Sequence, residues 1–251
     1  MYINTTGLVL RETAYKDSSK ILTVLTSTEG KLTVSARGAL RRNSKLAAVT
    51  QLLAFSEMTL MKTRDRFVMT EARSVEQFIG LRSDILLLSL GSYFAELAEA
   101  TADEDSPSPD LLPLCLNALF ALSEGLKTPD IVKPAFELRL MVVSGFAPRA
   151  ERCPVCGEED PDRAFLDIEG GTIHCGEHAP AEGASLSRSA LSAMRYVISC
   201  DPKKLFSFTL GVEALRELSS AAEGYLLAHL ERPFRTLDYF KRNRSNFYGS
   251  L

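Results

Sequence analysis

The residues best suited to chemistry in this 251-residue chain are cysteines and histidines that cluster between positions 153 and 178. The cluster begins Cys153-Pro-Val-Cys156 and closes Cys175-Gly-Glu-His178, so two pairs of ligands flank a connector of eighteen residues. Two ligands separated by two residues can face one ion from a tight turn, which is the pattern of a tetrahedral zinc knuckle. We therefore predict that Cys153, Cys156, Cys175 and His178 bind Zn²⁺.

An alternative fourth ligand is His174, which stands next to Cys175. Neighbouring side chains on a strand point to opposite faces, so His174 is expected to point away from the ion and is the weaker choice. Glycines follow both ligand pairs, at Gly157 and Gly176, where they are expected to ease the backbone of the two turns.

The connector between the ligand pairs predicts two short strands, 165–168 and 172–174, joined by a hairpin at Gly170-Gly171. A catalytic zinc keeps one coordination position open for water, whereas four protein ligands can close the site completely. The pattern therefore favours structural zinc that holds two turns together.

The alternative interpretation is a zinc-dependent hydrolase or deaminase acting on nucleic acid. Deaminases place His-x-Glu before Pro-Cys-x-x-Cys, and many zinc hydrolases carry His-Glu-x-x-His, but neither order occurs here. Walker, Gly-x-Gly-x-x-Gly and Gly-x-Ser-x-Gly motifs are also missing. His229, Cys115 and Cys200 lie in apolar helical stretches and are expected to be packed rather than reactive. We expect no enzymatic activity.

Basic residues are concentrated in the first part of the chain. Residues 1–80 hold twelve Lys and Arg against seven Asp and Glu, whereas residues 81–150 hold five against ten. This distribution indicates a surface directed at phosphates, although ordinary variation between domains is the alternative. The predicted DNA contacts are Arg37, Arg41, Arg42, Lys45, Lys62, Arg64 and Arg66.

Aromatic platforms for bases are few. The candidates are Tyr2, Tyr15, Phe55 and Phe67, of which Phe55 is expected in the core. A second basic segment near the C-terminus is either a disordered tail or an extension of the same surface. It comprises Arg232, Arg235, Lys241, Arg242 and Arg244.

Hydrophobic periodicity predicts an α+β protein. Its first 80 residues contain five strand candidates, which indicate a five-stranded OB-fold barrel. The strand candidates are 3–12, 20–27, 31–37, 53–62 and 66–74. After residue 83 the period changes to that of helices, which are expected at 84–100, 111–124, 129–144, about 187–200 and 211–230.

The expected domains are therefore an OB-fold at 1–80 and a helical domain at 81–251, with the zinc knuckle inserted at 150–180. No run of about eighteen apolar residues is present, so no membrane span is expected. The N-terminus lacks the features of a secretory signal. Five cysteines in a clustered pattern are more typical of a reducing compartment than of a disulfide framework, so we expect a cytoplasmic protein.

Residues along the whole chain resemble the RecO family of bacterial DNA repair and recombination mediators. The most specific block runs from a helix, through Gly145-Phe-Ala-Pro148, directly into Cys153-Pro-Val-Cys156-Gly157. The other matching segments are Gly7–Leu10, Leu25-Thr26, Glu29–Lys31, Ala36–Ala39 with Arg41, Arg42 and Ser44, Phe78, Leu81-Arg82 and Glu137–Leu140.

The resemblance implies an N-terminal OB-fold and a helical C-terminal domain that carries the knuckle. It also implies binding of single- and double-stranded DNA, annealing of complementary strands and a nucleoid-associated location. The implied partners are RecR and the C-terminal tail of single-stranded DNA-binding protein, with RecA loading as the outcome. Arg139 is our candidate for contact with that acidic tail. Family members differ at the second ligand pair, where many have Cys-x-x-Cys and this chain has His178 last.

Overall fold

The computed structural model describes the backbone of residues 1–64, 66–104 and 106–248, with side chains as far as residue 245. The chain forms two compact units, one of Met1–Glu124 with Phe234–Leu251 and one of Gly125–Pro233. None of the helices in the described ranges is long and apolar enough to cross a membrane.

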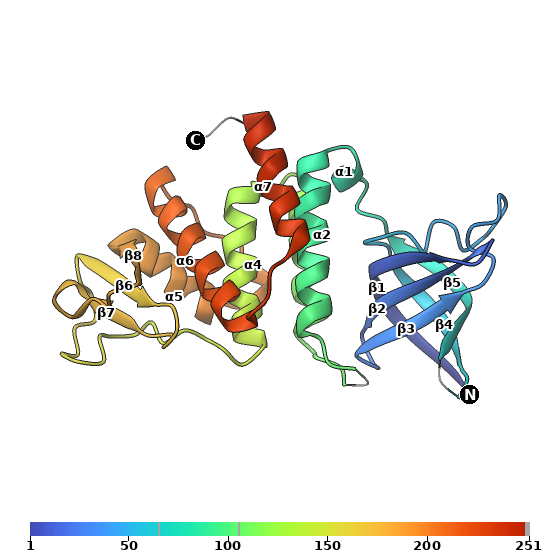
Figure 1. Cartoon of the computed structure of the whole chain (residues 1–251), viewed down its shortest axis with the longest axis horizontal. Helices are drawn as coiled ribbons and strands as arrows, with labels where there is room; N and C mark the ends of the chain where they lie inside the picture. The colour runs from blue at the N-terminus through green and yellow to red at the C-terminus, as the bar shows by residue number, and fades with distance from the viewer. Residues whose placement is uncertain (65, 105, 249–251) are drawn as a thin grey trace. The chain divides into compact units, whose positions relative to one another are not determined.

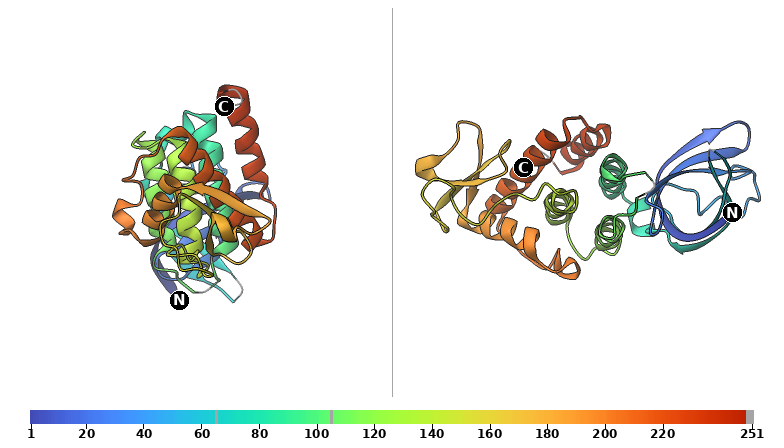
Figure 2. Two further views of the ribbon diagram at one scale, coloured as in Figure 1. Left: turned by 90° about the vertical axis from the view of Figure 1, so that its left-hand side faces the viewer. Right: turned by 90° about the horizontal axis from the view of Figure 1, so that it is seen from below.

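The first unit begins with a closed barrel of five strands in the order β1-β2-β3-β5-β4 (Figure 1). The predicted OB-fold is confirmed, and Figure 2 (right) shows the strands curling around one interior. The strands are β1 (Tyr2–Tyr15), β2 (Ser19–Thr26), β3 (Lys31–Ala36), β4 (Phe55–Lys62) and β5 (Phe67–Glu76).

Alternation along the strands explains why they close. On β3, Leu32, Val34 and Ala36 are buried in the barrel core, while the residues between them face outward. A period of two places every second side chain on the same face, so the apolar set fills the interior. Strand pairing is antiparallel except between β3 and β5, which pair in parallel at Phe67 and Val68 of β5.

Helices complete the first unit, four of them in the described ranges. They are α1 (Ile79–Arg82), α2 (Ile85–Thr101), α3 (Leu111–Ser123) and α7 (Arg235–Tyr248). The carboxylate of Asp84 accepts hydrogen bonds from the amides of Leu86 and Leu87, and so caps α2.

The C-terminal basic segment is helical, so its interpretation as a disordered tail is wrong. Helix α7 packs against α2, and Phe234, Leu237 and Phe240 are buried. The ring of Phe234 meets that of Tyr93 edge-on, with centroids 6.0 Å apart. Apolar residues three apart along one face of a helix are what permits this docking.

The second unit combines three α-helices with a three-stranded sheet in the order β7-β6-β8, which lies to one side of them (Figure 1). Its strands are β6 (Arg163–Asp167), β7 (Ile173–Cys175) and β8 (Gly183–Ser187), and its α-helices are α4 (Pro129–Val143), α5 (Arg188–Ser199) and α6 (Val212–Leu230). The predicted hairpin is β6–β7, whereas β8 was not expected. The hydroxyl of Ser187 caps α5 by accepting from the amide of Ala190.

Candidate metal centre and nucleic-acid surface

The four predicted zinc ligands come together in the second unit. Cys153 and Cys156 lie on a turn before β6, Cys175 ends β7, and His178 ends a 3₁₀ turn (Gly176–His178). Their ligand atoms all lie within 4.8 Å of one another.

The spacing of these atoms suits one tetrahedral ion. The Sγ atoms of Cys156 and Cys175 are 3.6 Å apart, and Nδ1 of His178 lies 3.2 Å from Cys175 Sγ and 3.9 Å from Cys153 Sγ. Zinc–sulfur and zinc–nitrogen bonds of about 2.3 and 2.0 Å at tetrahedral angles place ligand atoms roughly 3.5–3.8 Å apart. The group can therefore hold a metal ion without rearrangement of the fold.

The first ligand turn depends on a glycine. Gly157 adopts φ +80°, a left-handed conformation that a side chain would strain. Its amide donates to the carbonyl of Cys153 at 2.9 Å, and the amide of Cys153 donates to the carbonyl of Glu158 at 2.8 Å. Gly176, in contrast, has no positive φ and has open space where a Cβ would stand, so its expected role in easing the turn is wrong.

Backbone pairing brings the two ligand turns together. Arg149, just before the first pair, donates its amide to the carbonyl of Gly171 at 2.7 Å and accepts from the amide of Ile173 at 3.1 Å. The segment that leads into Cys153 therefore lies beside β7, which ends at Cys175.

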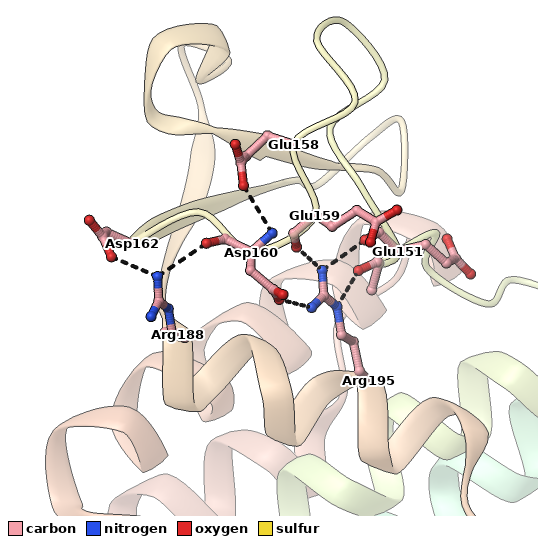
Figure 3. A network of polar contacts seen from close by, with 8 residues as sticks. Glu151, Glu158, Glu159, Asp160, Asp162, Arg188 and Arg195 are labelled. Atoms are coloured by element: carbon pink, nitrogen blue, oxygen red, sulfur yellow. Dashed lines mark hydrogen bonds and ion pairs between the residues drawn. The ribbon is translucent and has the colours of Figure 1, made fainter.

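Two arginines of α5 hold the loop that carries the first ligand pair (Figure 3). Arg188 donates to the carboxylate of Asp162 at 2.8 Å. The guanidinium of Arg195 donates to four groups, the carbonyl oxygens of Ala150, Glu151 and Glu159 and the carboxylate of Asp160. These carbonyls flank the turn on both sides, so Arg195 closes the loop independently of any ion.

The thiols of the cluster are set up unequally. Burial raises the pKa of Cys153, but amide groups of Cys156, Cys175 and Val155 outweigh it and lower that pKa to about 6. For Cys156, the amide of Glu158 lowers the pKa, but burial and the neighbouring thiols raise it overall. Deprotonation is therefore favoured at Cys153 and opposed at Cys156. A bound divalent cation would favour deprotonation of both thiols, because its charge cancels the repulsion between the two thiolates.

His174 lies outside the cluster, as the strand alternation predicted. Its Nε2 is 3.0 Å from the hydroxyl of Thr172. His229 is half-buried, with Nδ1 3.0 Å from the carbonyl oxygen of Tyr225. These contacts are structural.

The two remaining cysteines differ from each other. Cys115 is buried as expected, and burial raises the pKa of its thiol to about 12. Cys200 is half-buried, so it is less enclosed than a packed helical thiol was expected to be. Nη2 of Arg139 donates to the Cys200 carbonyl at 2.7 Å and lies 3.0 Å from its Sγ, so this guanidinium is engaged within the unit.

All seven predicted DNA contacts are exposed, and none of them forms an ion pair with another residue in the described ranges. Four follow the end of β3 and three belong to the end of β4 and the β4–β5 turn. Because β3 and β5 pair at Val34 and Phe67, both groups flank the same pair of strands. The barrel thus presents these cations beyond the two ends of the segment in which β3 and β5 pair, without ion-pair partners in the described ranges.

Helix α2 covers part of the neighbouring barrel face. The Glu99 carboxylate pairs with Arg11 at 2.8 Å and accepts from the hydroxyl of Thr23 on β2 at 3.4 Å. The Nζ of Lys31 donates to the carbonyl of Glu99 at 2.9 Å. In OB-folds the β2–β3 face and the loops beside it bind oligonucleotides. Because Lys31 also begins β3, the accessible part consists of the loops and the outer side of β3 beyond Lys31, where Thr33 is exposed.

One basic residue of this surface was missed by the sequence analysis. Lys16 lies in the β1–β2 turn with its Nζ 5.3 Å from the ring centroid of Tyr15. The amide of Leu40 donates to the carbonyl of Ser18 at 3.0 Å, which joins this turn to the loop after β3. The sequence did contain a signal for this residue, since Lys16 follows the aromatic Tyr15 in the turn between two strand candidates.

The four aromatic candidates for base stacking differ in their exposure. Tyr2 and Tyr15 are exposed, whereas Phe67 is buried and contributes to the barrel core. Phe55 is only partly buried, so it is not the fully enclosed core residue that was expected. Stacking of bases is thus open to the two tyrosines alone among the four.

A groove of the first unit lies elsewhere on the barrel, over β1, β4 and β5. It has a volume of about 560 Å³ and is lined mainly by Ser, Thr and Asn side chains. Its charged residues are Glu57, Glu71 and Arg73, so acidic groups outnumber basic ones. This balance makes the groove unsuited to phosphates.

The chain combines a closed OB barrel that carries exposed basic loops with helices and a Cys₃His cluster. These features place it in the class of OB-fold proteins with a metal-binding cluster in a second unit. Family models described as Recombination protein O N terminal and Recombination protein O C terminal match residues 1–78 and 82–238. Together they span both units. The chain belongs to the RecO family, which confirms the resemblance found in the sequence.

Curated relatives match almost end to end. The chain is 30% identical, over 95% of its length and 98% of the relative, to a DNA repair protein RecO of Caldicellulosiruptor bescii. It is 29% identical to one of Acetivibrio thermocellus, with 96% of each chain covered. A DNA repair protein RecO of Symbiobacterium thermophilum is 30% identical over 96% of this chain and 98% of its own.

Proposed function

We propose that this protein binds single- and double-stranded DNA, anneals complementary strands in recombinational repair and has no catalytic activity of its own. The single observation that carries the proposal is the set of seven exposed cations, without ion-pair partners in the described ranges, on an OB barrel of the RecO family. Relatives over nearly the whole length are named DNA repair proteins, which supports the same assignment.

The proposed contact uses residues 1–80. Arg37, Arg41 and Arg42 would hold phosphates as the backbone passes the end of β3, and Lys45 with Lys62, Arg64 and Arg66 would extend the path. Contacts of this kind are independent of sequence and leave the base edges free to pair with a second strand. Tyr15 and Tyr2 are available for stacking.

Zinc is proposed as a structural ion of the second unit, held by Cys153, Cys156, Cys175 and His178. When bound it supplies cross-linking of two turns rather than an activated water, since four protein ligands fill a tetrahedral shell. The proposed location of the protein is the cytoplasm, in association with the nucleoid. RecR, the acidic C-terminal tail of single-stranded DNA-binding protein and, through them, RecA loading are proposed from family membership.

The test replaces three arginines by alanine, Arg37→Ala with Arg41→Ala and Arg42→Ala. Losing three phosphate contacts should weaken binding of single-stranded DNA and reduce the slope of log affinity against log salt by about 2. Annealing of complementary oligonucleotides should slow in parallel.

The matched control replaces two exposed lysines of the second unit, Lys203→Ala with Lys204→Ala, and should leave affinity and slope unchanged. Thermal melting checks that both variants fold. Equal affinity and equal slope in the triple variant would refute the assignment of these arginines. X-ray absorption that found a coordination position open to water would instead favour a zinc-dependent enzyme.

A further inference from the structure

The second half of β5 has a backbone edge without a strand partner. β5 pairs with β4 from Phe67 to Glu76, with bulges at Thr70 and Val75 that leave Glu71–Ser74 as its regular stretch, but its pairing with β3 covers only Phe67 and Val68. On that edge, no backbone hydrogen bond from another part of the described chain reaches residues 70–75. The side chains there are exposed on both faces of the strand, at Thr70, Glu71, Arg73, Ser74 and Val75.

An exposed edge of this kind is a template for another strand, and proteins commonly block it with proline, lysine or a covering loop. Residues 70–75 contain neither proline nor lysine. The edge does carry two charges of opposite sign, Glu71 and Arg73, two positions apart and therefore on one face.

This charge pattern complements itself. When two identical strands pair antiparallel about a twofold axis, the central residue opposes its own copy. Centring on Ala72 places Glu71 opposite Arg73 of the second copy, and Arg73 opposite Glu71 of the second copy. Centring on Glu71 or on Arg73 instead places like charges opposite each other, which is unfavourable.

We propose that the β5 edge of one molecule pairs antiparallel, in the register centred on Ala72, with the same edge of a second copy. The existing partner of Arg73 does not prevent this, since its contact with Glu57 is 4.0 Å long and both side chains are more than half exposed. Such pairs contribute little stability. The paired edge is short, so the dimer is weak and forms as the protein concentration rises.

The test measures self-association by sedimentation equilibrium over a wide range of protein concentration. Glu71→Arg creates two facing arginine pairs and Arg73→Glu two facing glutamate pairs. Either change should weaken the dimer at least about tenfold. The double variant, Glu71→Arg with Arg73→Glu, restores opposite charges and should restore association.

A mixture of the two single variants provides the sharpest control. Each alone should be monomeric, but together they should form a heterodimer, because one strand then carries two arginines and the other two glutamates. This result cannot arise from misfolding of either variant. A wild-type protein that stays monomeric, or a dimer that the charge changes leave intact, would overturn the proposal.

Discussion

At the scale of single residues, the direction in which a side chain points from the backbone decides which histidine can bind the metal. His174 and His178 are four positions apart, yet only Nδ1 of His178 reaches the thiols. His174 is on β7 beside Cys175, and its Nε2 meets the hydroxyl of Thr172 instead. Alternation along the strand therefore selects the ligand.

His178→Ala should lower the zinc affinity at least about 100-fold, because a metal ligand is lost and even supporting residues are worth 10–100-fold. His174→Ala is the matched control and should bind zinc as the wild type does. Competition with a chromophoric chelator measures both affinities. Equal loss in the two variants would show that the fourth ligand has been misassigned.

At the scale of elements, α4 and α6 are joined by a buried charge cluster. Nζ of Lys133 lies 2.8 Å from the Glu137 carboxylate and 2.9 Å from that of Glu223 on α6. Lys133 and Glu137 are almost fully buried. Burial lowers the pKa of Lys133, but the two carboxylates outweigh it and raise that pKa overall, so the lysine stays charged at neutral pH.

Lys133→Met should destabilise the second unit by about 3–5 kcal/mol, since it leaves carboxylates buried without their cation. Urea unfolding followed by circular dichroism measures the change in the free energy of unfolding. Lys204→Met, at an exposed position, is the control and should change it by less than about 0.5 kcal/mol. A loss below about 1 kcal/mol for Lys133→Met would show that the helices do not depend on this cluster.

At the scale of the whole molecule, the two compact units are stabilised in different ways. The barrel and its helices rely on apolar packing, extended by Phe234, Leu237 and Phe240 of the C-terminal segment. The Cys₃His cluster lies entirely within Gly125–Pro233. A metal ion should therefore stabilise one unit and leave the other unaffected.

Calorimetry should show two transitions, of which a zinc chelator lowers only that of the second unit, by roughly 10 °C or more. His178→Ala should shift the same transition and so assign it. The affinity for single-stranded DNA should be nearly unchanged by chelation below that transition, because the basic loops belong to the first unit. A chelator that abolished DNA binding in folded protein would contradict this division.

Much of the first unit was predictable because its signals are local. Alternation on β3 and the spacing of apolar residues on the other strands indicate five half-buried strands, and a barrel is the arrangement that covers their edges. The Cys₃His cluster was predictable for the same reason, since two ligands separated by two residues indicate a metal-binding turn independently of the rest of the fold. The apolar residues of α7 were present at helical spacing but were overlooked beside its many charges.

Four features depended on contacts between distant parts of the chain. They are the docking of α7 on α2, the addition of β8 to the β6–β7 hairpin, the cover that α2 places over β2, and the unpaired edge of β5. A periodic pattern states that a face will be buried, but the surface that buries it is selected by packing between elements far apart in sequence. The residues thus specified the barrel, the knuckle and the family, whereas tertiary packing decided which basic and backbone groups stay exposed to a partner.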